Sequence, residues 1–341
     1  MRALVTGSAG FIGYHVAAAL LAEGAEVIGI DAHDPYYDPA LKAAREARLA
    51  AMPGYVGTRA RIEDPGVLAG LMARHRPEVV VHLAAQAGVR HSIENPRAYL
   101  ASNIAGTFEL LEAARAHPPR HMLLASTSSV YGANRDMPYR ETDKADSQMS
   151  FYAASKKATE AMAHSHAHLF GLPVTMFRFF TVYGPWGRPD MAPYLFTSAI
   201  LEGRPIRVFN HGDMRRDFTF VADLVRAIRG LIDAVPGTTP VGPEDSLSPV
   251  APFRIVNIGN GQPVELGDFI AAIERATGRE AIREMLPMQP GDVPATWADT
   301  TLLRRLTGDA PRTPVAEGVA AYVAWFRDYY GTPLAQGGAT A

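Results

Sequence analysis

The sequence of 341 residues contains no cysteine. This absence excludes disulfide bonds, thiolate metal ligands and a cysteine nucleophile, so we expect no metal site of that kind, and it is compatible with the reducing cytoplasm, where we place the protein. The chain also lacks a charge excess, because 33 lysines and arginines against 35 aspartates and glutamates give a formal net charge of −2. Such a balance argues against nucleic acid or an anionic membrane surface as the main partner.

Long hydrophobic runs are absent as well. No stretch of about 18 uncharged apolar residues occurs, so we expect no membrane span. The apolar segment 11–21 follows Arg2 and could be taken for a secretory signal, but glycines interrupt the region and it divides into a short strand and a helix. We therefore interpret it as the start of the mature fold.

The composition, with 48% hydrophobic and 20% charged residues, is that of a globular protein of one large or about two domains. Up to about residue 180, short apolar runs alternate with helical patterns. Strands of about five residues separated by helices of ten or more cannot pair through tight turns, so the pattern predicts a parallel, doubly wound α/β sheet. The predicted strands and helices of this region are 3–5, 11–23, 26–30, 65–74, 79–83, 96–116, 121–125, 151–170 and 174–179.

The alternation of short apolar runs with helical patterns ends beyond Thr181, and glycine and proline become frequent in 183–189 and 235–252. The second stretch predicts a surface loop of about 17 residues. Helices predicted over 221–234, 266–277 and 315–330 favour a smaller α/β domain that binds the substrate, although an appended dimerisation module is an alternative. We therefore divide the chain into domains 1–180 and 181–332, with a flexible glycine- and alanine-containing tail over 333–341.

A glycine turn with the spacing Gly-x-x-Gly-x-x-Gly follows the first strand and opens the first helix. Its glycines let the backbone approach a pyrophosphate, and the helix N-terminus supplies N–H donors to that anion. A plain strand-to-helix turn is the alternative, but Asp31 ends the next strand about 20 residues on, where a carboxylate binds the adenosine ribose. An acid repels a 2′-phosphate, and no arginine is adjacent, so NAD is favoured over NADP. The cofactor residues of this turn are Gly7, Gly10, Phe11, Ile12 and Gly13.

Tyr152 and Lys156 lie four residues apart in a predicted helix, which places both side chains on one face. A lysine ammonium near a phenol stabilises the phenolate, so the tyrosine could act as a base closer to neutral pH. A purely structural pair is the alternative interpretation. Downstream of a dinucleotide turn, the pair is the leading catalytic candidate.

A run of hydroxyls, Ser126, Thr127, Ser128 and Ser129, follows an apolar strand. Ligands of open parallel sheets bind outside the carboxyl ends of the strands, so these hydroxyls are expected to face the site. The alternative is an ordinary polar loop that caps itself through bonds to its own backbone.

Together, the glycine turn, the hydroxyl run ending in Val130-Tyr131-Gly132, and the Tyr-x-x-x-Lys pair resemble the extended short-chain dehydrogenase/reductases, a Rossmann-fold family that includes the NAD-dependent epimerases and dehydratases. The stretches 178–191, 210–218 and 285–295 are similar to those of the UDP-glucuronate 4-epimerases. This resemblance runs from about Met1 to Tyr330. It implies a bound NAD, a UDP-sugar substrate (UDP-glucuronate or UDP-galacturonate) and a homodimer paired through helices at about 97–116 and 152–170.

The resemblance also assigns roles by position. It implies that Thr127 is the catalytic hydroxyl, Tyr152 the base, and Lys156 its partner and a nicotinamide-ribose ligand. Further implied cofactor residues are Ile62, Leu83, Ala84, Ala85, Asn103 and Ser126. The implied substrate residues are Gln86, Arg90, Ser128, Ser129, Thr181, Arg188, Val208, Arg216 on phosphate and Asp292 on the uridine ribose. The chain departs from its relatives at Arg61, where an aspartate usually lies against the adenine, and at Gln289, which replaces an arginine of galactose-type epimerases.

The implied chemistry is transient oxidation at C4, followed by return of the hydride to the other face of the sugar. A 4-ketone makes the 6-carboxylate a β-keto acid, prone to lose CO₂, so donors must hold it in place. Our candidates are Thr181, Arg188, Ser128 and Ser129, although Arg188 could instead bridge to Asp190. Competing functions are a UDP-glucuronate decarboxylase, a 4,6-dehydratase and a non-catalytic NAD-sensing protein. The dehydratase is disfavoured because Ser128 and Ser129 stand where that chemistry needs an Asp-Glu pair.

Overall fold

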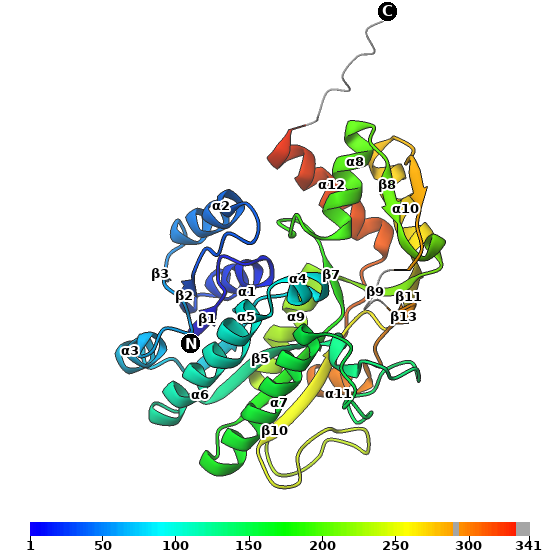
Figure 1. Ribbon diagram of the computed structural model, residues 1–341. Helices are drawn as coiled ribbons and strands as arrows, with labels where there is room; N and C mark the ends of the chain where they lie inside the picture. Colours follow the sequence, from blue (N-terminus) through cyan, green and yellow to red (C-terminus); the bar gives the residue numbers. More distant parts are fainter. Residues whose placement is uncertain (289–292, 332–341) are drawn as a thin grey trace, which may run out of the picture.

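In the computed structural model, which describes residues 1–288 and 293–331, seven parallel strands form one sheet with helices on both faces (Figure 1). The strand order continues outward in both directions from β1 and β4, so the predicted doubly wound sheet is confirmed. In sheet order the strands are β10 (Phe253–Ile258), β6 (Val174–Phe179), β5 (His121–Thr127), β4 (Val79–His82), β1 (Arg2–Thr6), β2 (Glu26–Asp31) and β3 (Tyr55–Arg59).

The sheet is apolar on both faces because successive side chains of each strand point to opposite sides. Leu4 of β1 lies beside Ile28 and Val80, and these three belong to the core of one face, whereas Val5 and Val81 belong to the core of the other. The second face is covered by α1 (Phe11–Ala22), α9 (Val221–Asp233) and α11 (Thr301–Thr307), and the first by α3 (Val67–His75), α6 (Gly106–Ala116) and α7 (Phe151–Phe170). No helix among the described residues is both long and apolar enough to span a membrane.

The helix predicted over 96–116 is interrupted. The chain forms α5 (Pro96–Tyr99), then a π-helical turn over Leu100–Ala105, then α6, and a short α4 (Val89–Glu94) precedes them. Within residues 1–180, α2 (Pro39–Ala50) and the edge strand β3 are also not among the predicted elements. In β3 every residue is at least partly exposed, so it lacks the apolar run that marks the central strands.

A smaller α/β part lies beside the large sheet, and Figure 1 shows its helices gathered around β8 (Ile206–Val208). Its own core consists of aromatic and aliphatic side chains from α8 (Ala192–Glu202), α10 (Leu266–Thr277), α12 (Val315–Tyr330) and the short strands. The helices predicted over 266–277 and 315–330 are confirmed, and residues 235–252 hold only turns and bends, as predicted. The elements are β7 (Thr181–Tyr183), α8 (Ala192–Glu202), β8 (Ile206–Val208), β9 (Arg215–Phe220), β11 (Pro263–Glu265), α10 (Leu266–Thr277), β12 (Arg283–Met285), β13 (Ala295–Thr296) and α12 (Val315–Tyr330).

The chain returns from the smaller part to the large sheet. Strand β10 pairs in parallel with β6, and α9 packs on the same face as α1. The expected boundary at residue 180 leaves these later elements out. We therefore propose that the cofactor unit consists of residues 1–180 together with α9, β10 and α11, and that the rest of 181–332 forms the substrate unit.

Candidate active site

A cavity of about 750 Å³ opens at the carboxyl ends of β1 and β4, where the strand order reverses, and the smaller α/β part closes its other side. This is where open α/β sheets bind ligands. It is lined by almost all the residues that the sequence analysis selected: Gly7, Gly10, Phe11, Ile12, Gly13, Asp31, Ile62, Leu83, Ala84, Ala85, Gln86, Arg90, Ser126, Thr127, Ser128, Ser129, Tyr152, Lys156, Thr181, Arg188 and Arg216. Asn103 and Val208 do not line it, and Asp292 lies outside the described residues.

The glycine turn can be built only from glycine at its critical positions. Gly7 has a left-handed φ of +72°, and a Cβ there would lie 2.8 Å from the backbone nitrogen of Ala84. A Cβ on Gly13 would lie 2.0 Å from the carbonyl oxygen of Gly7. The bare backbone and the N-terminus of α1 therefore form a cradle open to the cavity, which suits the pyrophosphate of a dinucleotide.

Asp31, at the end of β2, is fixed by two backbone donors. Its Oδ2 accepts a hydrogen bond from the Ala9 N–H at 3.1 Å, and its Oδ1 accepts one from the His33 N–H at 2.8 Å. Each carboxylate oxygen retains a lone pair that a ribose hydroxyl could use. The carboxylate thus ties the glycine turn to the adjacent strand and fits the predicted contact with adenosine ribose.

Cations lie nearer to this end of the cavity than the sequence analysis expected. The Nζ of Lys42, on α2, donates to the carbonyl oxygen of Asp34 at 2.8 Å, and Arg61 pairs with Glu63 at 3.0 Å and Asp34 at 3.3 Å. With Asp31, three carboxylates and two cations line this end of the cavity, so its balance remains negative and favours NAD. The signal for Lys42 was the N-cap Asp38 and Pro39, which mark the start of α2.

Tyr152, Lys156 and Thr127 converge on the cavity from α7 and the end of β5. The Lys156 Nζ donates to the carbonyl oxygen of Ala125 at 3.0 Å, and burial lowers the pKa of this lysine to about 8. Burial raises the pKa of Tyr152, against the opposing effects of a hydrogen bond with Thr127 and of the charge of Arg188. In the chain alone, desolvation of the phenolate outweighs the contributions of Thr127 and Arg188, so the pKa of Tyr152 lies above its ordinary value, and the lowering of this pKa by Lys156 stays a prediction.

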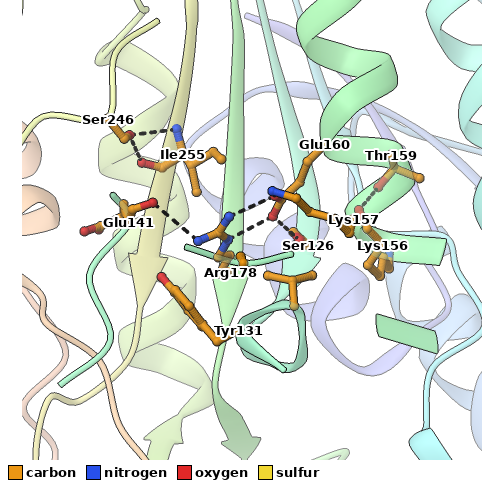
Figure 2. Close-up of polar contacts among 12 residues, drawn as sticks. Ser126, Tyr131, Glu141, Lys156, Lys157, Thr159, Glu160, Arg178, Ser246 and Ile255 are labelled. Carbon is orange, nitrogen blue, oxygen red and sulfur yellow. Dashed lines mark hydrogen bonds and ion pairs between the residues drawn. The ribbon is translucent and has the colours of Figure 1, made fainter. Parts of the chain in front are cut away.

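A buried ion pair connects β6 to α7 (Figure 2). Arg178 of β6 donates from Nε and Nη2 to the two carboxylate oxygens of Glu160 on α7, both at 2.9 Å, and the Ser126 hydroxyl donates to Oε1 of the same carboxylate at 2.7 Å. Burial opposes ionisation of Glu160, but the Arg178 contact prevails, so the pKa of this carboxyl lies below its ordinary value. The cluster joins β5, β6 and α7 and so fixes the elements that carry Thr127 and Tyr152. Because 18 residues separate Glu160 from Arg178, no short sequence motif predicts this pair.

Arg188 forms the ion pair that the sequence analysis left open as an alternative. Its Nε and Nη2 donate to the two carboxylate oxygens of Asp190 at 3.0 and 2.6 Å, and Nη2 also donates to the carbonyl oxygen of Ala87 at 3.2 Å. The Tyr36 hydroxyl donates to Asp190 at 3.1 Å. Burial opposes the charge of Arg188, but Asp190 more than compensates, so the pKa of the guanidinium lies above its ordinary value. The cavity wall thus contains a guanidinium with its fork on a carboxylate.

The other predicted substrate residues lie toward the smaller part. Arg216, on β9, donates to the carbonyl oxygens of Val293 and Pro294 at 2.7 and 3.1 Å, and the Arg90 guanidinium lies 4.9 Å from the ring centroid of Phe209. Both arginines line the cavity, and a diphosphate could bind beside them.

Asn103 and Val208 lie outside the lining of the cavity. Asn103 is buried in the π-helical turn, where its amide contacts both the N–H and the carbonyl of Gln86, at 2.8 and 3.1 Å, and the Ser155 hydroxyl at 2.9 Å. It therefore shapes the cavity wall from behind. Val208 is buried in the core because β8 turns it inward, while its neighbours Arg207 and Phe209 line the cavity instead.

The doubly wound sheet, the glycine cradle and the Tyr152, Lys156 and Thr127 cluster define an enzyme of the extended short-chain dehydrogenase/reductase class. Residues 3–242 match the family model described as the NAD dependent epimerase/dehydratase family. The chain belongs to that family.

Several relatives of the chain carry the name UDP-glucuronate 4-epimerase. The chain is 53% identical to the probable UDP-glucuronate 4-epimerase of Rhizobium meliloti (strain 1021), over 97% of this chain and 98% of that protein. It is 44% identical to UDP-glucuronate 4-epimerase 4 of Arabidopsis thaliana, over 96% of this chain and 75% of that one. Among solved structures, the UDP-glucuronic acid 4-epimerase from Bacillus cereus in complex with UDP-glucuronic acid and NAD matches with a TM-score of 0.87 and 30% identity, over 97% of this chain and 100% of that chain.

Proposed function

We propose that this protein is a UDP-glucuronate 4-epimerase that interconverts UDP-glucuronate and UDP-galacturonate through a transient 4-keto intermediate. The observation that carries the proposal is the position of Arg188. Its forked guanidinium grips a carboxylate on the wall of the same cavity as Tyr152, and its charge acts on that phenol. A sugar with a 6-carboxylate is the substrate that this arrangement suits, and the relatives named above support the choice.

The cofactor of this reaction is NAD. Gly7, Gly10 and Gly13 leave room for its pyrophosphate, and Asp31 for its adenosine ribose. When bound, NAD supplies a reversible hydride acceptor at C4 of the sugar. We expect NAD to copurify with the protein, and NADP as the main nucleotide released on denaturation would contradict the role of Asp31.

Tyr152 removes the proton of the 4-hydroxyl as that carbon is oxidised and returns it when the ketone is reduced. The positive charge of Arg188 and the hydrogen bond with Thr127 favour its phenolate, and Thr127 also has a hydroxyl for O4. Lys156 lies one helical turn away and adds a positive charge while it is protonated. We propose that Lys156 also binds the nicotinamide ribose.

Arg188 keeps the reaction an epimerisation. Loss of CO₂ from a β-keto acid requires the carboxylate to align with the ketone, and a bidentate guanidinium opposes that rotation. Thr181, Ser128 and Ser129 lie on the same cavity and provide further hydroxyls. Since Asp190 occupies the fork of Arg188 here, the substrate's carboxylate must displace it, and Asp190 retains the Tyr36 hydroxyl as a partner.

Arg216 and Arg90 bind the diphosphate, with Gln86 beside them and Asp292 on the uridine ribose.

The protein is a cytoplasmic homodimer paired through the π-helical turn with α6 and through α7. The dimer is supported by large apolar side chains exposed on these helices, including Leu100, Phe108, Leu169 and Phe170. Static light scattering of the wild type and of Phe108→Glu tests the dimer.

The decisive experiment is NMR of the products formed from UDP-glucuronate. UDP-galacturonate supports the epimerase, whereas UDP-xylose with CO₂ means a decarboxylase. No turnover of any UDP-sugar would revive the alternative of a non-catalytic NAD-binding protein.

A further inference from the structure

Arg45 is a fully buried arginine on α2 that does not line the cavity yet joins two loops that form it. Its Nη1 donates to the carbonyl oxygen of Ala9 at 3.0 Å and to the Tyr37 hydroxyl at 2.9 Å. Its Nη2 donates to the carbonyl oxygens of Trp186 and Gly187 at 2.6 and 3.4 Å. One planar side chain thus contacts both the glycine turn and the loop that carries Arg188.

On the cofactor side, Arg45 completes the restraint of a single peptide group. The Ala9 N–H is held by Asp31, the Gly10 N–H donates to the Gly7 carbonyl oxygen at 2.9 Å, and Arg45 holds the carbonyl of Ala9. The peptide between Ala9 and Gly10 is therefore fixed at both its donor and its acceptor. Any shift of this turn must move the guanidinium.

On the substrate side, Arg45 binds the backbone at a strained residue. Trp186 has a φ of +62°, a left-handed conformation that a large aromatic residue rarely adopts. Its ring packs between Tyr14, with centroids 5.6 Å apart, and Tyr329 at 5.0 Å, so both parts of the molecule hold it. Because Arg188 follows only two residues later, the backbone conformation of Trp186 helps to determine the position of the Arg188 side chain.

The segment before Trp186 is held by a neutral histidine. The His15 ring, on α1, contacts the Pro185 carbonyl oxygen through Nε2 at 2.8 Å, and burial lowers the pKa of this histidine to about 4. His15 therefore keeps this contact uncharged at neutral pH. Arg45 is then the charged link between the loop and the nucleotide turn.

We propose that Arg45 is a positioning residue that couples the nucleotide turn to the Arg188 loop and so helps to set the preference for a 6-carboxylate. The inference rests on the proposed function. Lysine cannot replace Arg45, because a single ammonium lacks the two separated Nη groups that reach the two loops. Since the coupling free energy between two binding sites is reciprocal, UDP-glucuronate should also tighten the binding of NAD, which we expect to be seen as slower release of NAD.

The test compares the holoenzyme with Arg45→Lys. We expect the preference for UDP-glucuronate over UDP-glucose, as a ratio of kcat/KM, to fall about 10-fold, the scale of one lost charge-assisted contact. We also expect UDP-glucuronate to slow NAD release from the wild type but not from Arg45→Lys. The matched control is Arg254→Lys, since Arg254 is also buried and pairs with Asp245, and neither residue lines the cavity. That control should lower stability and leave the substrate ratio unchanged.

Two results would overturn the inference: equal losses for both substrates, or retention of the effect of UDP-glucuronate on NAD release. Tyr37→Phe removes only one of Arg45's contacts and serves if Arg45→Lys does not fold; a smaller shift of the ratio is expected, and an unchanged ratio counts against the coupling. If the wild type does not turn over UDP-glucuronate, the proposed function fails. The NAD-release measurement still tests the coupling in that case.

Discussion

Two arginine–carboxylate pairs of similar geometry differ in burial. The side chains of Arg178 and Glu160 are 1% and 3% exposed, whereas those of Arg188 and Asp190 are 18% and 25% exposed. Glu160 also accepts hydrogen bonds from Ser126 and Lys157, and the pair joins a strand to a helix. Asp190 lies in a loop on the cavity wall and accepts a hydrogen bond from the Tyr36 hydroxyl.

The difference in burial decides what each pair can do. Opening the Arg178 pair would leave a charge uncompensated in the protein interior, so that pair is restricted to a structural role. The Arg188 pair borders the cavity, where, under the proposed function, the 6-carboxylate of the substrate replaces Asp190. On that proposal, two similar bidentate contacts act as a fixed support in one region and as an exchangeable binding group in the other.

The largest effect should come from Glu160→Gln. Leaving Arg178 buried without its carboxylate is expected to lower the free energy of unfolding by about 3–5 kcal/mol. Asp190→Asn is the matched control, and there we expect a loss of less than about 1 kcal/mol because the pair is partly solvated. Chemical denaturation of both variants measures the two values. Equal losses would contradict the distinction drawn from burial.

Tyr152→Phe should have the next largest effect. We expect kcat to fall by about 100-fold, the scale for loss of a general base, with little change in the affinity for the UDP-sugar. Lys156→Met should be similarly slow and should also bind NAD less tightly. Unlike Glu160→Gln, Tyr152→Phe should leave stability nearly unchanged, because no buried charge loses its partner. Near-normal turnover would remove Tyr152 from the mechanism.

The sequence predicted the parts of the site that depend on local spacing. Gly7 to Gly13 and the pair Tyr152 and Lys156 each lie within one turn or one helix face, so a short motif defines them. Asp31 was found because it ends the strand that follows the glycine helix. The sheet was predicted for the same reason, since its central strands are continuous apolar runs.

Features made by distant residues were not predicted. Glu160 and Arg178 meet only because α7 packs beside β6, and Arg45 reaches Trp186 across 141 positions of the chain. The pairing of Arg188 with Asp190 could be stated only as an alternative, because two residues two positions apart can contact each other or a ligand. Val208, which the resemblance implied as a substrate residue, is buried in the core of the smaller part, because side chains alternate along a strand and the resemblance did not establish which of them face the cavity.

Arg188→Ala tests the exchangeable pair. Removing the guanidinium should weaken binding of UDP-glucuronate more than binding of UDP-glucose, by about 2 kcal/mol, the order of a charge-assisted hydrogen bond to a buried anion. A loosened carboxylate should also allow some loss of CO₂ and release of a 4-keto pentose product. Calorimetry with both nucleotides and NMR of the products measure these effects. Equal losses for the two would assign Arg188 to the loop or the diphosphate, with Arg90 as the next candidate for the carboxylate.

The smallest effect concerns Glu141, a second buried acid near Arg178. Its carboxylate, unlike that of Glu160, forms no bidentate ion pair with Arg178 among the described contacts. Burial raises the pKa of Glu141 to about 7, although its Oε1 accepts a hydrogen bond from the Asn257 N–H at 2.8 Å. The folded protein therefore binds a proton that the unfolded chain releases between its ordinary pKa, near 4.5, and about 7. The stabilisation is complete below that window and is lost as the pH rises through it. We expect the free energy of unfolding to fall by about 1–2 kcal/mol more in the wild type than in Glu141→Gln between pH 5 and pH 8. Chemical denaturation at several pH values measures this difference. Parallel pH dependences of the two proteins would mean that Glu141 is ionised throughout this range. The charge of Arg178 would then be enough to keep a second buried carboxylate ionised.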